Sequence, residues 1–380
     1  MSKKLLLVIG EDRSFLTHRE PIAALAKSKG WDVTIVTHDT GRRADIERMG
    51  YKYTELPINL TGMNLSEEAR TFRFLYSLCK ENKDAIVHLV GLKNMLWGGT
   101  AARLNNVRGV VFAVSGLGTL FGEKSSKILA WSLLHFLRYG MHKRNINVIF
   151  QNHVDQGLFV ENKLARRETL SYTKGAGANL DEYCFTPAPS KKPLVVIFTG
   201  RMLEDKGVPD LIKAAEILRP EYEGKVVFRL FGTLSTNPSA LTEDDLLSMT
   251  DGKYIKWFGH HDDICSQLKQ ADIMCFPSYY REGVPKSLIE ASAIGRPLVT
   301  TDSVGCRDTV EDGVNGFIVP PHSPEKIAEA LKKLIDDPEL RQRMGRESRR
   351  IAERDYDVNR VADIHLDIYE KLYQASLYQK

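Results

Sequence analysis

Short apolar runs alternate with longer amphipathic segments along the chain, and this pattern restricts the possible folds more than any other feature. It opens with an apolar run at 5–9, an amphipathic stretch at 19–29 and a second apolar run at 33–37. Strands that alternate with helices predict a parallel sheet flanked by helices. The first half continues with segments of the same kind, a strand at 85–89, a helix at 96–104 and strands at 109–114 and 147–151.

The alternation starts again after residue 193, so the sequence predicts a second domain of the same α/β architecture. The intervening stretch 175–189 is rich in Gly, Ala and Pro and is typical of a linker. The second series comprises strands at 194–199, 226–231, 255–258, 273–276 and 298–301 and helices at 209–218 and 286–294. We expect a first Rossmann-like domain over residues 1–172 and a second over 173–359, with a C-terminal helix at 360–380 that packs back on the first domain.

The composition is that of an ordinary globular protein, 43% hydrophobic and 27% charged. No stretch approaches the roughly 20 apolar residues that cross a bilayer, and the N-terminus has no signal-peptide pattern. The five cysteines are widely spaced without a Cys-x-x-Cys pair, so we expect buried thiols in a reducing compartment. These features predict a cytoplasmic protein.

Positive charge is concentrated in the N-terminal half. Residues 1–185 carry 26 Lys and Arg against 18 Asp and Glu. A basic surface meets nucleic acid, anionic lipid or a phosphorylated substrate. Because no nucleic-acid-binding motif is present, we expect no nucleic-acid partner and favour a phosphate or an anionic membrane.

Two cations follow the strand predicted at 194–199, in a turn that leads into a helix. They are Arg201, which directly follows Gly200, and Lys206, which directly precedes Gly207. A diphosphate is held best by a guanidinium, an ammonium and the free N–H groups of a helix start. Solvated turn charges give the same pattern, so this motif indicates a diphosphate site only in company with others.

Two carboxylates lie eight residues apart after the strand predicted at 273–276. We expect Glu282 in a loop and Glu290 about one turn inside the next helix, where both face one crevice. Two unrelated surface glutamates are the alternative, and the preceding buried strand favours the site. Between the glutamates, a helix start offers backbone amides suited to a phosphate. The residues assigned to this part of the donor site are Val284, Pro285, Lys286, Ser287 and Leu288.

Taken together, these motifs resemble glycosyltransferase family 4, a group of retaining enzymes with the two-domain GT-B fold. Four motifs carry the resemblance in chain order: Gly175 to Asp181, Gly200-Arg201 with Lys206-Gly207, Glu282 with Glu290, and Gly313 to Phe317. They cover nearly the whole C-terminal half. The resemblance implies two Rossmann-like domains facing a central cleft, with a nucleotide-sugar donor bound by the C-terminal domain.

The N-terminal half resembles bacterial members of the family that build lipid-linked oligosaccharides and surface polysaccharides. Family members often carry a histidine in the loop after the strand at 111–114, and this chain has Ser115 there. A histidine beside a buried strand is more often structural than functional, which leaves that alternative open for His88. The candidates for the acceptor or sugar side are His18, His88, Lys93, Ser115 and Gly116.

The resemblance also implies a mechanism. Arg201 and Lys206 would neutralise the leaving diphosphate, Glu282 would bind the sugar hydroxyls and Glu290 the ribose. Since two cations supply the charge, and no Asp-x-Asp motif lies in a suitable loop, we expect no metal or other cofactor. Front-face attack would retain the anomeric configuration without a protein nucleophile.

The expected donor is a UDP-sugar carrying an N-acetylhexosamine or hexose, and the expected acceptor is a polyprenyl-diphosphate-linked glycan. GDP-mannose, a soluble acceptor and a non-catalytic nucleotide-sugar-binding subunit are the alternatives. Epimerase or phosphorylase chemistry fits the four charged residues less well.

A predicted helix at 125–144 combines aromatic and basic side chains and is too short to span a bilayer. Such a helix suits the surface of an anionic membrane, where a lipid-linked acceptor is presented. An ordinary core helix of the first domain is the alternative. The membrane reading places the protein at the inner face of the cell membrane, with contact through Lys127, Trp131, Phe136, Arg138, Lys143 and Arg144.

Overall fold

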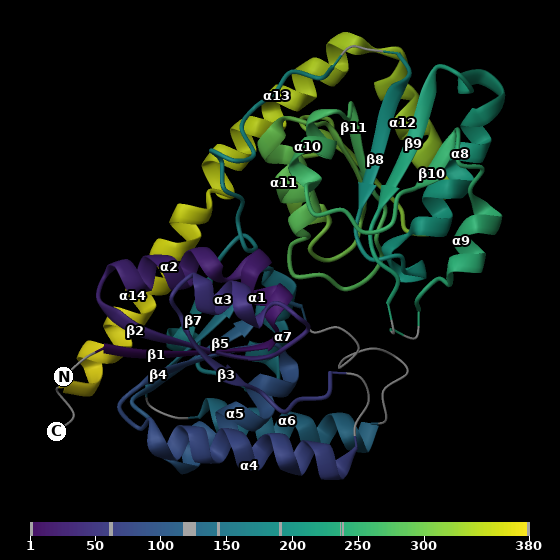
Figure 1. Ribbon diagram of the computed structural model, residues 1–380. Helices are drawn as coiled ribbons and strands as arrows, with labels where there is room; N and C mark the ends of the chain where they lie inside the picture. The colour runs from purple at the N-terminus through teal and green to yellow at the C-terminus, as the bar shows by residue number, and fades with distance from the viewer. Residues whose placement is uncertain are drawn as a thin grey trace. The chain divides into compact units, whose positions relative to one another are not determined.

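The computed structural model describes residues 3–60, 64–116, 127–142, 145–189, 192–235, 237 and 239–377, and only the backbone of 127–132 and 377. The chain forms two compact units (Figure 1). Unit 1 comprises Met1–Ala176 and Val358–Lys380, and unit 2 comprises Gly177–Asp357. The chain therefore passes from unit 1 to unit 2 and returns.

Unit 1 is built on a parallel seven-stranded sheet of order β3-β2-β1-β4-β5-β6-β7. Its strands are β1 (Lys3–Glu11), β2 (Trp31–His38), β3 (Lys52–Glu55), β4 (Ile86–Val90), β5 (Gly109–Val114), β6 (Ile146–Phe150) and β7 (Leu170–Tyr172). Its helices are α1 (Asp12–His18), α2 (Glu20–Ser28), α3 (Arg43–Arg48), α4 (Leu65–Glu81), α5 (Leu92–Leu104), α6 (Lys127–Met141), α7 (His153–Glu161) and α14 (Val358–Leu377), with a 3-10 turn η1 (Arg167–Thr169).

Helices cover both faces of this sheet, as the alternating pattern predicts. α4, α5 and α6 lie side by side on one face, and α2 and α14 lie on the other (Figure 1). Each face has its own apolar core, one centred on Val87, Phe112 and Phe150 and the other on Ile35 and Tyr369. The C-terminal helix is thus an integral part of unit 1.

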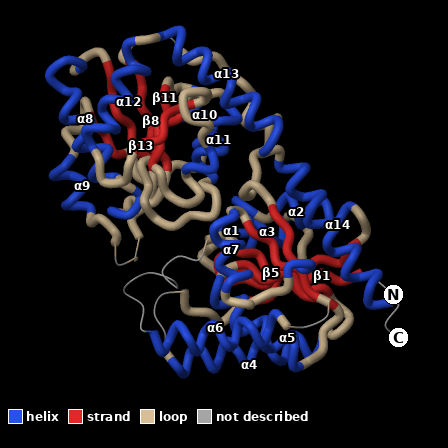
Figure 2. The backbone as a smooth tube through the Cα atoms, turned by 180° about the vertical axis from the view of Figure 1, so that it is seen from behind, coloured by secondary structure: helices blue, strands red, loops and turns tan. Residues whose placement is uncertain are grey.

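Unit 2 repeats the architecture with a parallel six-stranded sheet of order β10-β9-β8-β11-β12-β13, whose strands are coloured red in Figure 2. Its strands are β8 (Leu194–Thr199), β9 (Val226–Phe231), β10 (Ile255–Trp257), β11 (Ile273–Phe276), β12 (Leu298–Thr301) and β13 (Gly316–Val319). Its helices are α8 (Val208–Tyr222), α9 (Glu243–Met249), α10 (Ile264–Lys269), α11 (Lys286–Ile294), α12 (Pro324–Asp336) and α13 (Pro338–Asp355), with 3-10 turns η2 (Glu204–Lys206) and η3 (Arg307–Thr309). The predicted α/β fold class with two Rossmann-like sheets is confirmed.

In each sheet the strand order reverses at one point. In unit 1 the reversal lies between β1 and β4, and in unit 2 it lies between β8 and β11. Ligands of open parallel sheets bind at the carboxyl ends of the strands on either side of such a reversal. The loops after β8 and β11 are therefore where a binding site is expected in unit 2.

Two sequence expectations need correction. Cys184 is exposed, whereas the other four cysteines are buried as expected. α5 begins at Leu92, four residues earlier than predicted, because Gly91 at its N-terminus adopts a φ of 88° and starts the helix directly after β4. Within the described residues, no helix is long and apolar enough to cross a membrane.

Candidate functional site

The two predicted cations of unit 2 lie in the loop that follows β8, next to the strand-order reversal. This loop contains the turn η2 and ends at Gly207, which has a φ of 72°. A Cβ atom at Gly207 would stand 2.1 Å from the carbonyl oxygen of Pro277, at the end of β11. Glycine is required here because the two loops approach so closely.

Lys206 lies at the centre of this site. Its side chain is 11% exposed and forms an ion pair with Glu282, which is 15% exposed. Its Nζ also stands 5.0 Å from the ring centre of Phe276 and 5.9 Å from that of Tyr280. Two aromatic faces and a carboxylate thus hold the ammonium group at the end of β11.

The loop after β11 is fixed to the cation-bearing turn by hydrogen bonds. The backbone N–H groups of Tyr279 and Tyr280 donate to the carbonyl oxygen of Asp205 at 2.9 and 2.8 Å, and the Ser278 hydroxyl donates to the same oxygen at 3.2 Å. Lys206 and Glu282 therefore belong to one preorganised framework.

Arg201 is exposed in the loop that follows β8. Burial raises the pKa of Tyr280, and the charges of Arg201 and Glu282 act on its hydroxyl in opposite directions. Arg201 therefore lies within electrostatic reach of the aromatic wall beside Lys206. Two cations and one carboxylate meet at the carboxyl ends of β8 and β11.

α11 supplies the second carboxylate and a helix start. Pro285 is the N-cap residue, and the hydroxyl of Ser287 donates to the carbonyl oxygen of Thr199 at 2.7 Å, which ties the helix to the end of β8. Glu290 is 8% exposed, and its carboxylate lies 3.2 Å from the Nζ of Lys286. The N–H groups of a helix's first turn point away from the helix and suit an anion, and this turn begins at Lys286.

Two of the residues predicted around this helix start do not face it with their side chains. Leu288 is fully buried in the core of unit 2, and its N–H donates to the carbonyl oxygen of Pro285 at 3.1 Å. The side chain of Leu288 is therefore packed in the core and its N–H is bonded, and its donor contact stays a prediction. Val284 is also buried, which leaves its backbone as its polar contribution.

The candidates in unit 1 fall into different environments. His18 is exposed at the end of α1, with its Nδ1 2.6 Å from the hydroxyl of Thr17. Lys93 forms a 2.6 Å ion pair with the buried Glu68 and donates to the carbonyl oxygen of Asn59 at 2.6 Å. Lys93 thus ties α5 to α4, in addition to any substrate contact.

His88 is fully buried on the face of the sheet that α14 covers. Its Nδ1 lies 2.6 Å from the hydroxyl of Tyr369, and its ring stacks on that of His365 with centres 5.5 Å apart. Burial, the neighbouring His365 and Arg19 hold the pKa of His88 well below its usual value. The lowered pKa keeps His88 neutral, and its burial fits the structural role that the sequence analysis left open. Its acceptor contact stays a prediction.

Ser115 and Gly116 end the described part of the loop after β5, where Ser115 is exposed and Gly116 has a φ of 111°. On α6, Phe136 is 45% exposed, and Arg138 is also exposed and donates to the carbonyl oxygen of Asn162 at 2.5 Å. The other predicted membrane-contact side chains lie outside the described residues; they are those of Lys127, Trp131, Lys143 and Arg144.

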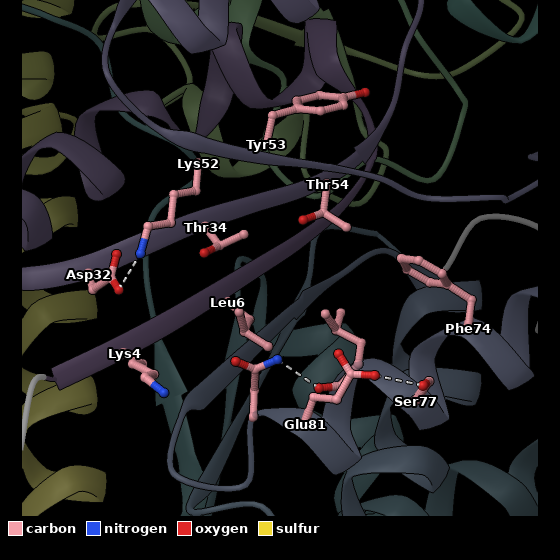
Figure 3. Close-up of a pocket in the computed structure, with 12 residues that line it drawn as sticks. Lys4, Leu6, Asp32, Thr34, Lys52, Tyr53, Thr54, Phe74, Ser77 and Glu81 are labelled. Carbon is pink, nitrogen blue, oxygen red and sulfur yellow. Dashed lines mark hydrogen bonds and ion pairs between the residues drawn. The ribbon is translucent and has the colours of Figure 1, made fainter.

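A cavity of about 600 Å³ lies in unit 1 on the sheet face beside α4. Figure 3 shows two contacts among its wall residues, Lys52 with Asp32 and Ser77 with Glu81, which measure 2.6 and 2.9 Å. Lys4, a third wall residue, pairs with Asp84. It lies toward the amino ends of β1, β2 and β3, away from the strand ends where ligands of such sheets bind. It includes none of the predicted site residues.

Residues that the sequence analysis did not single out complete the site. Tyr280 and Phe276 flank Lys206, and burial and the charge of Glu290 raise the pKa of the buried Tyr183. Burial raises the pKa of the Cys306 thiol to about 12, and the charges of Glu282 and Lys206 shift this pKa in opposite directions. Within the described residues, no group of three or more His, Cys, Asp or Glu side chains is arranged to hold a metal ion.

Both halves of the chain match known families. Residues 181–351 match the family described as Glycosyl transferases group 1, and residues 4–152 match the family described as Glycosyl transferase 4-like. The first match contains all four charged residues of the unit 2 site.

Individual relatives agree with these matches. The chain is 23% identical over 371 residues to the N,N'-diacetylbacillosaminyl-diphospho-undecaprenol alpha-1,3-N-acetylgalactosaminyltransferase of Campylobacter jejuni, which covers 93% of this chain and 95% of the relative. It is 34% identical over 160 residues to the capsular polysaccharide biosynthesis glycosyltransferase CapM of Staphylococcus aureus, covering 42% of this chain and 41% of the relative.

Among solved structures, Anabaena HepE in complex with UDP and glucose is similar in fold, with a TM-score of 0.77 and 18% identity over 97% of this chain and all of the other. That likeness bears on the fold alone. The family matches in both halves agree with the GT-B-like pair of parallel sheets, so the chain is a glycosyltransferase with a Glycosyl transferase 4-like N-terminal half and a Glycosyl transferases group 1 C-terminal half.

Proposed function

We propose that this glycosyltransferase moves an N-acetylhexosamine or hexose from a UDP-sugar to a polyprenyl-diphosphate-linked glycan, with retention of the anomeric configuration. The observation that carries the proposal is the constellation of Arg201, Lys206 and Glu282 at the strand-order reversal of unit 2, beside the start of α11. Cations and helix N–H groups suit a leaving diphosphate, and a nearby carboxylate suits sugar hydroxyls.

In the proposed reaction, Lys206 and Arg201 stabilise the negative charge that develops on the leaving UDP. The Lys206–Glu282 ion pair holds the ammonium in place before substrate arrives, so little reorganisation is needed during reaction. Glu282 accepts hydrogen bonds from the donor sugar, and Glu290 accepts them from the ribose. The N–H groups of Lys286 and Ser287 face the phosphates.

The two cations also support metal-independent transfer. A guanidinium and an ammonium together match the charge that a divalent ion would otherwise supply. The leaving phosphate would accept the proton of the attacking hydroxyl on the same face of the sugar. No protein nucleophile takes part in this scheme.

The lipid-linked acceptor is supported by two observations. The match to the Campylobacter relative covers 95% of that protein, which is named for an undecaprenol-diphosphate-linked acceptor. α6 exposes Phe136, and the neighbouring Tyr139 is 40% exposed, next to the basic Arg138. Aromatic and basic side chains on one short helix suit the interface of an anionic membrane at the inner face of the cell membrane.

The test measures transfer of a radiolabelled sugar from UDP-N-acetylgalactosamine, UDP-N-acetylglucosamine, UDP-glucose and GDP-mannose. Each donor is offered with an undecaprenyl-diphosphate-linked saccharide in anionic vesicles and with the same saccharide lacking lipid. We expect turnover with one UDP-sugar and the lipid-linked acceptor, without added metal and in the presence of a chelator. The Lys206→Ala variant should lose about 10²- to 10³-fold in kcat, whereas Lys213→Ala on the exposed face of α8 should not.

Each part of the proposal has its own contrary result. Turnover with GDP-mannose alone would replace the donor, and equal turnover of the lipid-free saccharide would remove the membrane acceptor. Product with the inverted anomeric configuration, read by NMR, would remove retention. Nucleotide binding without turnover on any donor and acceptor pair would favour a non-catalytic subunit.

A further inference from the structure

The segment that follows β12 has no role in the proposed chemistry, although it packs directly on the backbone of Glu282. This segment, residues 302–308, is called the β12 loop here and includes the start of the turn η3. β12 pairs with β11 in the parallel sheet, so the loops at the carboxyl ends of the two strands are neighbours. The loop after β11 carries Glu282. The β12 loop therefore borders the residues around the Lys206–Glu282 ion pair.

Gly305 brings the backbones of the two loops into direct contact. Its φ is 85°, and a Cβ atom at this position would overlap the carbonyl oxygen of Gly283. The same atom would stand 2.8 Å from the carbonyl oxygen of Glu282 and 3.0 Å from the Cβ of Glu282. Only glycine combines the positive φ with so close an approach of two backbones.

The β12 loop is anchored within unit 2. Cys306 is fully buried in the core, and its carbonyl oxygen accepts from the N–H and the hydroxyl of Thr309 at 3.0 and 2.7 Å. The carboxylate of Asp308 accepts from the N–H of Gly305 at 3.1 Å. These contacts fix the backbone at Gly305 from within its own loop.

Glu282 is held from two sides. Its carboxylate is paired with Lys206, and its backbone and Cβ lie against Gly305. Neither Glu282 nor Gly283 belongs to a helix or a strand. Because the β12 loop is anchored in the core, a side chain added at Gly305 is expected to displace Glu282 rather than the β12 loop.

We propose that Gly305 and Asp308 are positioning residues for Glu282, which align its carboxylate with the hydroxyls of the donor sugar. This inference rests on the proposed function, in which Glu282 accepts hydrogen bonds from that sugar. Gly305 sets the distance between the two backbones, and Asp308 holds Gly305 in place through its N–H. Neither residue touches the donor in this scheme.

A displacement of Glu282 is expected to weaken binding of the sugar more than binding of the nucleotide. Hydrogen bonds weaken steeply when their geometry is lost, and a binding group has to be held within about 0.5 Å of its productive position. In the proposed function, the phosphates and the ribose are bound by other residues. The ratio of the Kd of a UDP-sugar to the Kd of UDP therefore reports the contacts of the sugar, because changes common to both ligands cancel.

The test measures this ratio by calorimetry with UDP, UDP-glucose and UDP-N-acetylgalactosamine. It compares the wild type with Gly305→Ala, Glu282→Ala and the double variant. For the UDP-sugar that the wild type binds more tightly, we expect Gly305→Ala to raise the ratio about tenfold, the effect of one hydrogen bond to a charged group. In the Glu282→Ala background the same change should add less than twofold.

Gly224 provides a matched control in unit 2. Its φ is 79°, it is exposed between α8 and β9, and a Cβ atom there would meet no other atom within 4 Å. Gly224→Ala therefore places alanine at a similar φ without the collision, and it should leave the ratio unchanged. An equal rise of the ratio in this control would assign the effect of Gly305→Ala to backbone strain and overturn the proposal.

Asp308 offers a milder variant that avoids the collision. The residue is exposed, so Asp308→Ala removes the acceptor of the Gly305 N–H without opening the core. We expect Asp308→Ala to raise the ratio about threefold, toward the lower end of the effect of one hydrogen bond. Asp308→Asn keeps an acceptor oxygen and should restore the ratio. If Gly305→Ala does not fold, an unchanged ratio in Asp308→Ala is the result that contradicts the proposal.

Other outcomes separate this proposal from the function on which it rests. If the wild type binds neither UDP-sugar, or if Glu282→Ala leaves the ratio unchanged, the sugar contact of the proposed function is wrong and the positioning role falls with it. If Glu282→Ala raises the ratio but Gly305→Ala and Asp308→Ala do not, the positioning role alone is wrong. A Gly305→Ala effect that persists in full in the Glu282→Ala background would show that Gly305 does not act through Glu282.

Discussion

At the scale of single residues, Asp251 shows how one carboxylate organises a turn of unit 2. Its Oδ1 accepts from the N–H groups of Lys253, Tyr254 and Ile255 at 2.9, 2.9 and 3.0 Å, and its Oδ2 accepts from Arg219 at 2.6 Å. Burial acts to raise the pKa of Asp251, but these hydrogen bonds outweigh it and lower the pKa to about 2. The folded chain therefore stabilises the ionised form of Asp251 more than the unfolded chain does.

The stability that Asp251 contributes is predicted to depend on pH. A depressed pKa stabilises the fold above the unfolded value of about 3.9, and the contribution is lost as the pH falls through about 2. We expect the free energy of unfolding in urea at pH 7 to be about 1 to 2 kcal/mol higher for the wild type than for Asp251→Asn. This difference should shrink between about pH 4 and pH 2. A stability difference for Asp251→Asn that stays constant over this pH range would contradict the assignment.

The sequence predicts the site residues of unit 2 better than it predicts their partners. Arg201, Lys206, Glu282 and Glu290 follow buried strands, and strand ends of a parallel sheet converge at one edge. The Lys206–Glu282 ion pair joins residues 76 positions apart, so no local sequence pattern predicts it. The same holds for His88, because its bond to Tyr369 joins residues 281 positions apart. This candidate for the acceptor side lies buried in unit 1.

At the scale of elements, strands that are largely buried are predictable, whereas the exposed edge strand β3 is not. β8, β9, β11 and β12 have the predicted bounds, because each is largely apolar and largely buried. β3 was not predicted: its four residues are exposed or half-buried and carry no apolar run. The sequence analysis also expected a C-terminal helix that packs back on the first domain, and α14 lies in unit 1, where it contacts α2 and β5.

The attachment of α14 to unit 1 is predicted to depend on the buried hydroxyl of Tyr369. Tyr369→Phe removes the partner of the fully buried His88 Nδ1 and leaves that nitrogen without its hydrogen bond. An unsatisfied buried polar group costs about 1 to 3 kcal/mol, so we expect a loss of this size in the free energy of unfolding, measured in urea. Tyr76→Phe, whose ring is 38% exposed on α4, should change it by less than about 0.5 kcal/mol.

A Tyr369→Phe loss no larger than that of the exposed control would show that water replaces the hydroxyl at His88. In that case water must reach His88 between the sheet and α14 in the Tyr369→Phe variant. Hydrogen exchange of the α14 amides distinguishes the two cases, because loosening of the helix raises their exchange rates.

At the scale of the whole molecule, the chain is divided between two units with separate cores, which it links by two crossings. A ligand that binds one unit stabilises that unit by mass action, by about 2.7 kcal/mol at a concentration one hundred times its Kd. The four charged residues of the proposed donor site all lie in unit 2. We therefore expect UDP to raise the unfolding temperature of unit 2 in scanning calorimetry.

Two variants identify the transitions in that experiment. Tyr369→Phe should lower the unfolding temperature of unit 1 and leave the UDP-dependent shift intact, because its contacts lie with His88 and α14. Lys206→Ala should abolish the UDP shift without moving the transition that Tyr369→Phe moves. A UDP shift confined to the transition that Tyr369→Phe lowers would place the nucleotide in unit 1, and the assignment of Lys206, Glu282 and Glu290 to the donor would fail. A single transition moved by both variants would show instead that the two cores unfold as one cooperative body.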